Sequence, residues 1–265
     1  MTGCVGTDFF GDFLEGELRE LGVDTRGLRR SRDRGTSKTV ILPVAGEDRR
    51  FVHSFGANAE FTVGHIDRSL LADCEVFYLG GYLVLPAVSA PALAELCADA
   101  RARGVRTVVD VVVPQEADVS IESVREILPH VDFFVPNEDE ARALTGEAEP
   151  HRQTACLVEA GSGTVIITCG TAGAVLRSRD ELLEVPAPRV ESIEQSGAGD
   201  AFSAGLIAGM LAGWGARRTV RFASVVGASA TTALGCTTGV FSRAQAEAFM
   251  EKHMPEPHLR AFPQP

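Results

Sequence analysis

Two glycines and an acid open an apolar, small-residue segment in the stretch SGAGDAFSAGLIAGML. Gly197 and Gly199 allow backbone conformations that a side chain would disfavour. In such conformations consecutive amide groups, including the amide of Ala198, can point toward one place. The amides open a predicted helix over residues 200–214, and its dipole makes the turn suited to an oxyanion or phosphate. Asp200 would repel such an anion unless it accepts a proton from a hydroxyl that attacks the phosphate. The alternative interpretation is a plain helix N-cap, for which these residue types are also typical.

The elements that must hold this turn alternate between strand and helix. Apolar runs separated by segments with helical spacing indicate βαβ units and a parallel sheet covered on both faces. Further along, two short strands predict a hairpin, and three helices follow. The predicted parallel strands cover residues 75–81, 106–114, 131–137 and 164–170, the hairpin covers 173–188, and the last helices cover 200–214, 216–234 and a segment from 242.

The segment over residues 37–61 differs from this alternation, because it reads as two strands that turn at residues 46–48. We interpret it as a small β-flap beside the main sheet. The sequence shows no repeat and no clear linker. We therefore predict one α/β domain over residues 1–265 that carries a β-lid.

The motif GAGDAF with its apolar helix resembles the second signature of the ribokinase-like (PfkB-type) carbohydrate kinases. The resemblance implies a three-layer α/β/α fold and ATP-dependent transfer of the γ-phosphate to a sugar hydroxyl. It also implies that Asp200 is the catalytic base and that Gly197, Ala198 and Gly199 form the anion hole. The family usually has Asp-Thr-Thr just upstream, where it helps to hold a monovalent cation. Here residues 194–196 are Glu-Gln-Ser, which leaves K⁺ dependence open.

Two further motifs match the nucleotide side of this family. Asn137 and Glu140 follow a predicted strand as Asn-x-x-Glu, which in the family organises Mg²⁺ and the nucleotide phosphates through water. The same spacing is also a helix capping box, and both interpretations can hold together. Thr168, Gly170 and Gly173 match the Thr-x-Gly-x-x-Gly of the nucleotide site, although such a pattern alone is usually a turn.

The remaining candidates carry weaker signals. Ala223 and Gly227 resemble the small-residue helix that walls the adenine pocket, but a tightly packed helix pair explains them equally well. On the sugar side, the resemblance suggests four substrate-binding candidates, although Asn58 is equally typical of a turn. Asp110 lies inside an apolar strand, where a carboxylate is costly unless it is paired. The four are Asn58, Gly81, Tyr82 and Asp110.

The family normally begins with a strand that ends in a sugar-binding Asp, followed by lid strands and a Gly-Gly-x-x-x-Asn signature, and none of these precedes Met1. A missing inner strand would leave neighbouring backbone and apolar surface unpaired. We expect the working protein to be longer than this sequence. The alternative is a truncated, non-catalytic nucleotide-binding protein of the same fold.

Composition narrows the class of partner. A formal net charge of −11 argues against nucleic acid or anionic membrane as a partner. The sequence has neither a secretory signal nor a membrane span, and its six cysteines form no metal-binding or C-x-x-C pattern, so we predict a cytoplasmic protein. A nicotinamide oxidoreductase is a weaker alternative, because no good strand precedes the glycines. The expected substrate is a small sugar or nucleoside, and a homodimer paired through the lid is a further expectation from the family.

Overall fold

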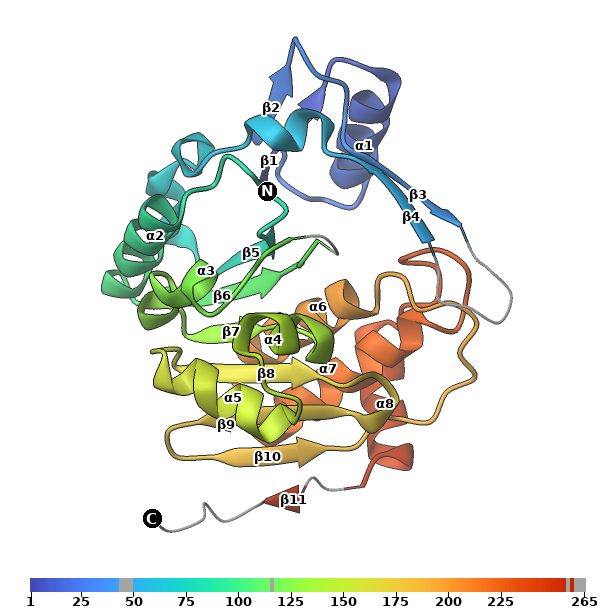
Figure 1. Ribbon diagram of the computed structural model, residues 1–265. Helices are drawn as coiled ribbons and strands as arrows, with labels where there is room; N and C mark the ends of the chain where they lie inside the picture. Colours follow the sequence, from blue (N-terminus) through green and yellow to red (C-terminus); the bar gives the residue numbers. More distant parts are fainter. Residues whose placement is uncertain (43–49, 115–116, 256–257, 260–265) are drawn as a thin grey trace.

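A seven-stranded sheet forms the centre of the computed structural model, which describes residues 1–42, 50–114, 117–255 and 258–259 (Figure 1). The strand order is β11-β10-β9-β8-β7-β6-β5. Strands β5 to β8 are parallel, whereas β9, β10 and β11 each pair antiparallel with their neighbour. The strands are β5 (Val76–Tyr82), β6 (Arg106–Val111), β7 (Phe133–Val135), β8 (Thr164–Thr168), β9 (Ala174–Ser178), β10 (Leu182–Val185) and β11 (His258–Leu259). The predicted parallel strands and hairpin are confirmed.

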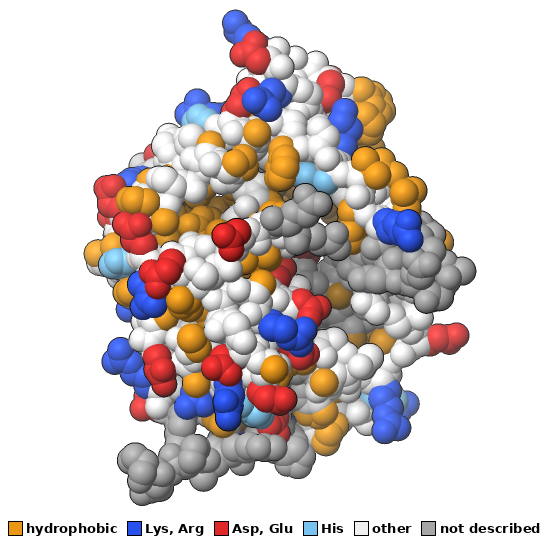
Figure 2. Space-filling model, viewed as in Figure 1, with side chains coloured by type: hydrophobic (Ala, Val, Ile, Leu, Met, Phe, Trp, Pro, Cys, Tyr) orange, Lys and Arg blue, Asp and Glu red, His pale blue; other side chains and the backbone are white. Residues whose placement is uncertain are grey.

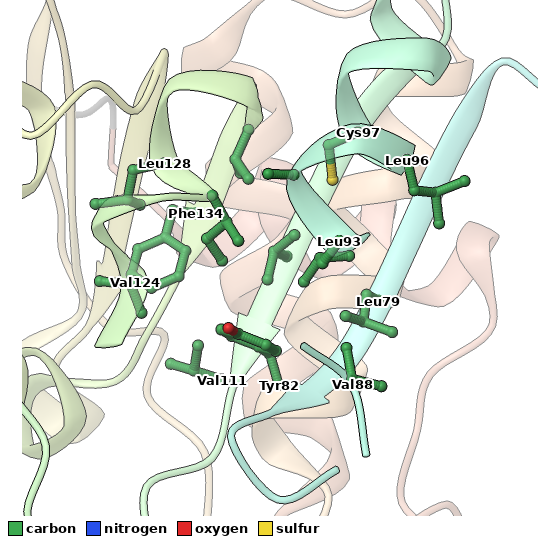
Figure 3. Close-up of a cluster of buried hydrophobic side chains, with 14 of the residues drawn as sticks. Leu79, Tyr82, Val88, Leu93, Leu96, Cys97, Val111, Val124, Leu128 and Phe134 are labelled. Carbon is green, nitrogen blue, oxygen red and sulfur yellow. The ribbon is translucent and has the colours of Figure 1, made fainter. Parts of the chain in front are cut away.

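Helices cover both faces of this sheet, so the predicted α/β class is confirmed. On each strand, successive side chains point to opposite faces. Val108 therefore packs in one hydrophobic cluster and Val109 in the other. The first face carries α2 (Ala90–Ala102), α3 (Glu122–Arg125), η4 (Leu128–His130), α4 (Glu138–Thr145) and α5 (Pro150–Glu159), and the second carries α6 (Ala198–Leu211), α7 (Ala216–Ala230) and α8 (Arg243–His253). Figure 3 shows part of the first cluster, between α2, α3 and strands β5 to β7.

Small residues set the close contact between α6 and α7. A Cβ atom added at Gly205 would lie 2.8 Å from the Cα of Ala223, and one added at Gly227 would lie 3.0 Å from the carbonyl oxygen of Ala198. The two helices can therefore approach until their backbones nearly touch. This contact fixes the start of α6 against a rigid neighbour.

The N-terminal part forms two small sheets of its own. β1 (Thr2–Gly6) pairs parallel with β2 (Gly27–Ser31), and β3 (Lys38–Leu42) pairs antiparallel with β4 (Arg50–Ser54). Among the described residues, β1 pairs only with β2, and β5 pairs only with β6. The two strands of the predicted flap are thus confirmed, while its predicted turn at 46–48 lies outside the described residues. The other elements here are α1 (Phe9–Glu20), η1 (Gly56–Glu60), η2 (Val63–His65) and η3 (Arg68–Asp73).

One polar cluster ties the base of the flap to the end of β1. Asp8 caps α1 by accepting a hydrogen bond from the Gly11 amide, and it also accepts bonds from the amide and hydroxyl of Thr36. The Thr36 hydroxyl oxygen in turn accepts the Gly6 amide at 2.9 Å. The root of the flap is therefore fixed, although every residue of β4 is exposed.

The helix boundaries differ from prediction where turn chemistry decides them. The helix predicted over 216–234 ends at Ala230, and α5 was not predicted at all. Pro150 stands in the first turn of α5, where a missing amide costs nothing. In the described part of the chain, no helix is long and apolar enough to cross a membrane.

Candidate active site

Several of the predicted nucleotide and catalytic residues meet at the carboxyl edge of the parallel strands, where open α/β sheets bind ligands. A cavity of about 40 Å³ lies between the ends of β6, β7 and β8 and the first turns of α6. Sequence analysis predicted five of its eight lining residues. The lining residues are Asp110, Val135, Asn137, Glu140, Thr168, Gly199, Phe202 and Ser203.

The glycine turn has the predicted geometry at the start of α6. Gly197 caps the helix with φ +80°, a left-handed conformation that side chains disfavour. A Cβ atom added there would lie 2.4 Å from the carbonyl oxygen of Cys236, so the turn also needs glycine for space. At Gly199 an added Cβ would meet nothing within 4 Å, which leaves open space in front of the turn. The first amides of a helix have no partner within the helix, and the positive end of the helix dipole lies at this turn. The Ala198 amide donates to the carbonyl oxygen of Gln195 at 3.3 Å.

Asp200 lies in the first turn of α6, directly beside this space. Its side chain is open to solvent at the mouth of the site, yet the surrounding protein removes enough water to raise the pKa of the carboxyl group. A raised pKa makes a carboxylate a better proton acceptor, provided that it stays ionised at working pH. Asp200 is thus an exposed carboxylate with a raised pKa, next to the glycine turn that opens α6.

Asn137 and Glu140 form the capping box that their spacing predicts. The Asn137 side chain accepts the Glu140 amide at 2.9 Å, and the Glu140 carboxylate accepts the Asn137 amide at 2.8 Å. A bridge between Asn137 and Thr168 joins this turn to the end of β8. Burial raises the pKa of Glu140 to about 7, with the negative charge of Asp110 adding to the effect.

The two glycines after β8 have different structural roles. Gly170 has φ +52°, and an added Cβ there would meet nothing within 4 Å. Gly173 has φ +103°, and a Cβ there would lie 2.0 Å from the carbonyl oxygen of Val185. Gly170 therefore borders open space that a ligand can enter, whereas Gly173 is required by the turn between β8 and β9.

Asp110 is paired, as a carboxylate inside an apolar strand must be. It accepts hydrogen bonds from the Tyr78 hydroxyl at 3.3 Å and the Ser203 hydroxyl at 3.1 Å. Burial raises its pKa to about 6, and the charge of Asp200 adds to this. Sequence analysis missed Tyr78 and Ser203. The available signal for Ser203 was its place three residues after Asp200, which puts both side chains on one face of α6.

The structure moves three candidates away from the open site. Ala223 and Gly227 are buried in the contact between α6 and α7, so the helix-pair interpretation explains both. Tyr82 is only 4% exposed and packs in the first hydrophobic cluster, because a bulge between Leu79 and Tyr82 turns its side chain to the α2 face (Figure 3). The structure therefore places Tyr82 in the core and not at the open edge of the sheet.

The other two sugar-side candidates lie outside the lining of the cavity. Gly81 has φ +72° and ends β5 at the same carboxyl edge. Asn58 is half-buried on η1, which packs against β1 and β2. Neither is among the residues that line the cavity.

The donor set fits a hard divalent cation that keeps some of its water. Asp110, Asn137 and Glu140 supply oxygen atoms around the cavity, which is the ligand type that Mg²⁺ prefers. Within the described chain, no three acidic, histidine or cysteine side chains converge as a direct metal cage. Mg²⁺ at this place would therefore retain waters and contact the phosphates of a nucleotide.

The segment upstream of the glycine turn retains one feature of a cation site. Ser196 is 4% exposed, and its hydroxyl oxygen has no hydrogen-bond partner among the described residues. Its amide donates to the Glu194 carboxylate at 2.8 Å. A buried oxygen without a partner is suited to a monovalent cation, but the neighbouring carboxylate is already engaged by the backbone.

Comparison with known proteins agrees with this geometry. The family model for pfkB family carbohydrate kinases matches residues 1–242. A ribokinase from Haemophilus influenzae is 24% identical over 255 residues, covering 94% of this chain and 80% of that protein. An aminoimidazole riboside kinase from Salmonella typhimurium is 26% identical over 260 residues, covering 95% and 82%.

A solved structure gives the same result in three dimensions. A putative ribokinase II from E. coli, in complex with ATP and Mg²⁺, superposes with a TM-score of 0.80 at 27% identity, covering 95% of this chain and 82% of that one. The fold thus follows a known arrangement, and this chain belongs to the pfkB family of carbohydrate kinases.

Proposed function

We propose that this chain transfers the γ-phosphate of ATP to a hydroxyl group of a small sugar or nucleoside. The observation that carries the proposal is Asp200 in the first turn of α6, directly after the left-handed Gly197. The names of the relatives, which include a ribokinase and an adenosine kinase, support this substrate class. In this proposal residues 1–265 form one kinase domain with residues 37–61 as its lid.

In the proposed mechanism Asp200 accepts the proton of the attacking hydroxyl. The amides of the Gly197 to Gly199 turn and the dipole of α6 stabilise the charge that develops on the phosphoryl group. These donors are preorganised, since Gly197 is fixed against Cys236 and α6 against α7. Such donors act without further rearrangement of the protein during the reaction.

Thr168 and Gly170 would border the nucleotide, while Asn137 and Glu140 would hold the water shell of Mg²⁺. When bound, Mg²⁺ supplies positive charge to the phosphate oxygens. Asn58 and Gly81 are proposed on the acceptor side. Asn58→Ala is expected to raise the KM for the acceptor more than the KM for ATP.

The test is acceptor-dependent release of ADP, measured with a panel of sugars and nucleosides in K⁺ and in Na⁺. Asp200→Asn keeps the size of the side chain but removes the base, so turnover should fall by a factor of about 10² to 10⁴. ATP affinity, measured by calorimetry, should change little. Asp180→Asn, at an exposed residue of the β9–β10 turn, is the matched control.

Equal turnover in the Asp200→Asn variant would remove the proposed role of this carboxylate. ATP binding without acceptor-dependent ADP release in the unmodified protein would instead favour the alternative, a non-catalytic nucleotide-binding protein. If turnover requires K⁺, we would place the bound cation at the buried hydroxyl group of Ser196.

The proposed homodimer rests on the apolar surface of the flap. Val40, Phe51 and Val52 are each at least half exposed, and Figure 2 shows further apolar side chains gathered where α1 and the flap lie. Sedimentation velocity should give a dimer that Val52→Lys dissociates. Leu211→Lys, at an exposed residue near the end of α6, should leave the dimer intact.

A further inference from the structure

Three polar side chains from three different elements meet beneath the first turn of α6. Tyr78 comes from β5, Asp110 from β6 and Ser203 from α6. Both hydroxyl groups donate to the same carboxylate oxygen, Oδ2 of Asp110, at 3.3 Å from Tyr78 and 3.1 Å from Ser203. Ser203 is 1% exposed, so its hydroxyl group depends on this bond.

The backbone near this cluster leaves room for the tyrosine. A Cβ atom added at Gly80 would lie 2.9 Å from the Tyr78 hydroxyl oxygen and 3.2 Å from two ring carbons. A side chain at Gly80 would therefore displace the hydroxyl group from Asp110. The first glycine of the YLGGY stretch thus has a steric role in this cluster.

The cluster is one helical turn away from the proposed base. Ser203 follows Asp200 by three residues, which places both on one face of α6. Asp110 and Ser203 also line the cavity that Asn137, Glu140 and Gly199 share. A change in the bonds to Asp110 would therefore shift the anion-binding turn relative to the nucleotide side of the site.

We propose that Tyr78 and Ser203 are positioning residues, which act through Asp110 to hold the first turn of α6 at the distance that phosphoryl transfer requires. This inference rests on the proposed function. Loss of either hydroxyl group should lower turnover, because misplacing a catalytic group by about 1 Å can cost as much as 10²-fold in rate. Loss of either hydroxyl group should change ATP binding little, since Thr168, Gly170 and Asn137 lie on other elements.

The electrostatics of the cluster agree with this role. The pKa of Asp110 is raised by burial to about 6, and its hydrogen bond from Ser203 opposes that rise. The two hydroxyl donors therefore support the ionised carboxylate at neutral pH. Burial raises the pKa of the Tyr78 hydroxyl well above its usual value, so it remains a donor.

The chain offers a matched pair of tyrosines for the test, since it contains only two. Tyr78→Phe removes one hydrogen-bond donor to Asp110. Tyr82→Phe removes the hydroxyl group of a buried tyrosine on the same strand, whose side chain packs in the core on the other face of the sheet. We expect Tyr78→Phe to lower kcat about tenfold with the KM for ATP within about twofold. Tyr82→Phe should keep kcat within about twofold of the unmodified enzyme even where urea unfolding shows lower stability.

A second pair of variants tests the other donor. Ser203→Ala should reproduce the loss of kcat, and Ser224→Ala should not, because the buried Ser224 hydroxyl has no hydrogen-bond partner in the described part of the chain. The double variant Tyr78→Phe/Ser203→Ala should lose less than the product of the single losses, since both groups serve one oxygen atom. Gly80→Ala should resemble Tyr78→Phe.

Different results overturn different conclusions. If the unmodified protein releases no ADP with any acceptor, the proposed function fails and the positioning roles fail with it. If the unmodified enzyme is active but Tyr78→Phe and Ser203→Ala keep its kcat, the proposed function stands and the positioning roles are refuted. The positioning roles would also be refuted if Tyr78→Phe and Tyr82→Phe had the same stability and lost the same fraction of kcat.

Discussion

Changing Glu140 to glutamine removes one ionisable group from the active-site cavity while keeping the capping geometry, because a glutamine side chain can accept the Asn137 amide as glutamate does. In the folded protein, burial raises the pKa of Glu140 from 4.5 to about 7. The folded state therefore favours the protonated form. This contribution to stability is fully present below pH 4.5 and is lost as the pH rises through 7.

The size of the effect follows from the shift in pKa. Between pH 5 and pH 8.5, the ionisation of this one group should lower the free energy of unfolding by about 2.5 kcal/mol. The Glu140→Gln variant lacks this ionisable group. Over the same pH range, its free energy of unfolding should therefore fall by about 2.5 kcal/mol less than that of the unmodified protein. Asp110 contributes in the same direction in both proteins, so the comparison isolates Glu140 together with its charge coupling to Asp110.

The assay is urea unfolding of the protein without nucleotide or Mg²⁺ at half-unit steps of pH. The difference in unfolding free energy between Glu140→Gln and the unmodified protein should grow with pH, most steeply between pH 5 and 7. Asp180→Asn, at an exposed residue of the β9–β10 turn, is the control, and its difference from the unmodified protein should not grow with pH in this way. A difference that is constant with pH would refute the reasoning that burial holds this carboxyl group in its protonated form.

Glycine positions give further predictions. Gly197→Ala should reduce turnover at least tenfold in initial-rate assays, because the left-handed φ costs about 1–2 kcal/mol and the new Cβ would lie 2.4 Å from the carbonyl oxygen of Cys236. Gly205→Val should lower the free energy of urea unfolding by about 2–3 kcal/mol, since the added Cβ would lie 2.8 Å from the Cα of Ala223. Gly16→Ala, in an open position on α1, should raise that energy by about 0.5–1 kcal/mol, and a loss there would contradict the assignment of free space.

The sequence was most informative where one residue pattern has both a local and a chemical cause. Asn137 and Glu140 cap a helix and also point into the site, so their spacing identified them. Asp110 was identified because a carboxylate inside an apolar strand requires a partner. Its partners Tyr78 and Ser203 were not predicted, because the first lies on a separate strand and the second lies among small residues that also suit helix packing.

Three candidates lie away from the cavity because of features that single-sequence patterns do not encode. Tyr82 ends a strand beside a glycine, which suggested a place at the ligand edge, but the bulge after Leu79 turns it into the core. Ala223 and Gly227 belong to a stripe of small residues, and only the packed helices show that α6 fills the space beside them. The distinction between a pocket wall and a helix contact depends on the partner helix.

The fold holds three carboxyl groups of this site where their ionised forms are unfavourable. Asp110, Glu140 and Asp200 each have a raised pKa, burial is the first cause in every case, and charge adds to it from Asp200 to Asp110 and from Asp110 to Glu140. The fold holds these groups in place with capping bonds and hydroxyl donors, which do not neutralise their charge. A cation bound near these acids would lower all three pKa values together, which agrees with the proposed use of Mg²⁺. The glycine turn that opens α6 lies next to Asp200, and under the proposed function a nucleotide whose phosphates carry Mg²⁺ would satisfy both the turn and these acids.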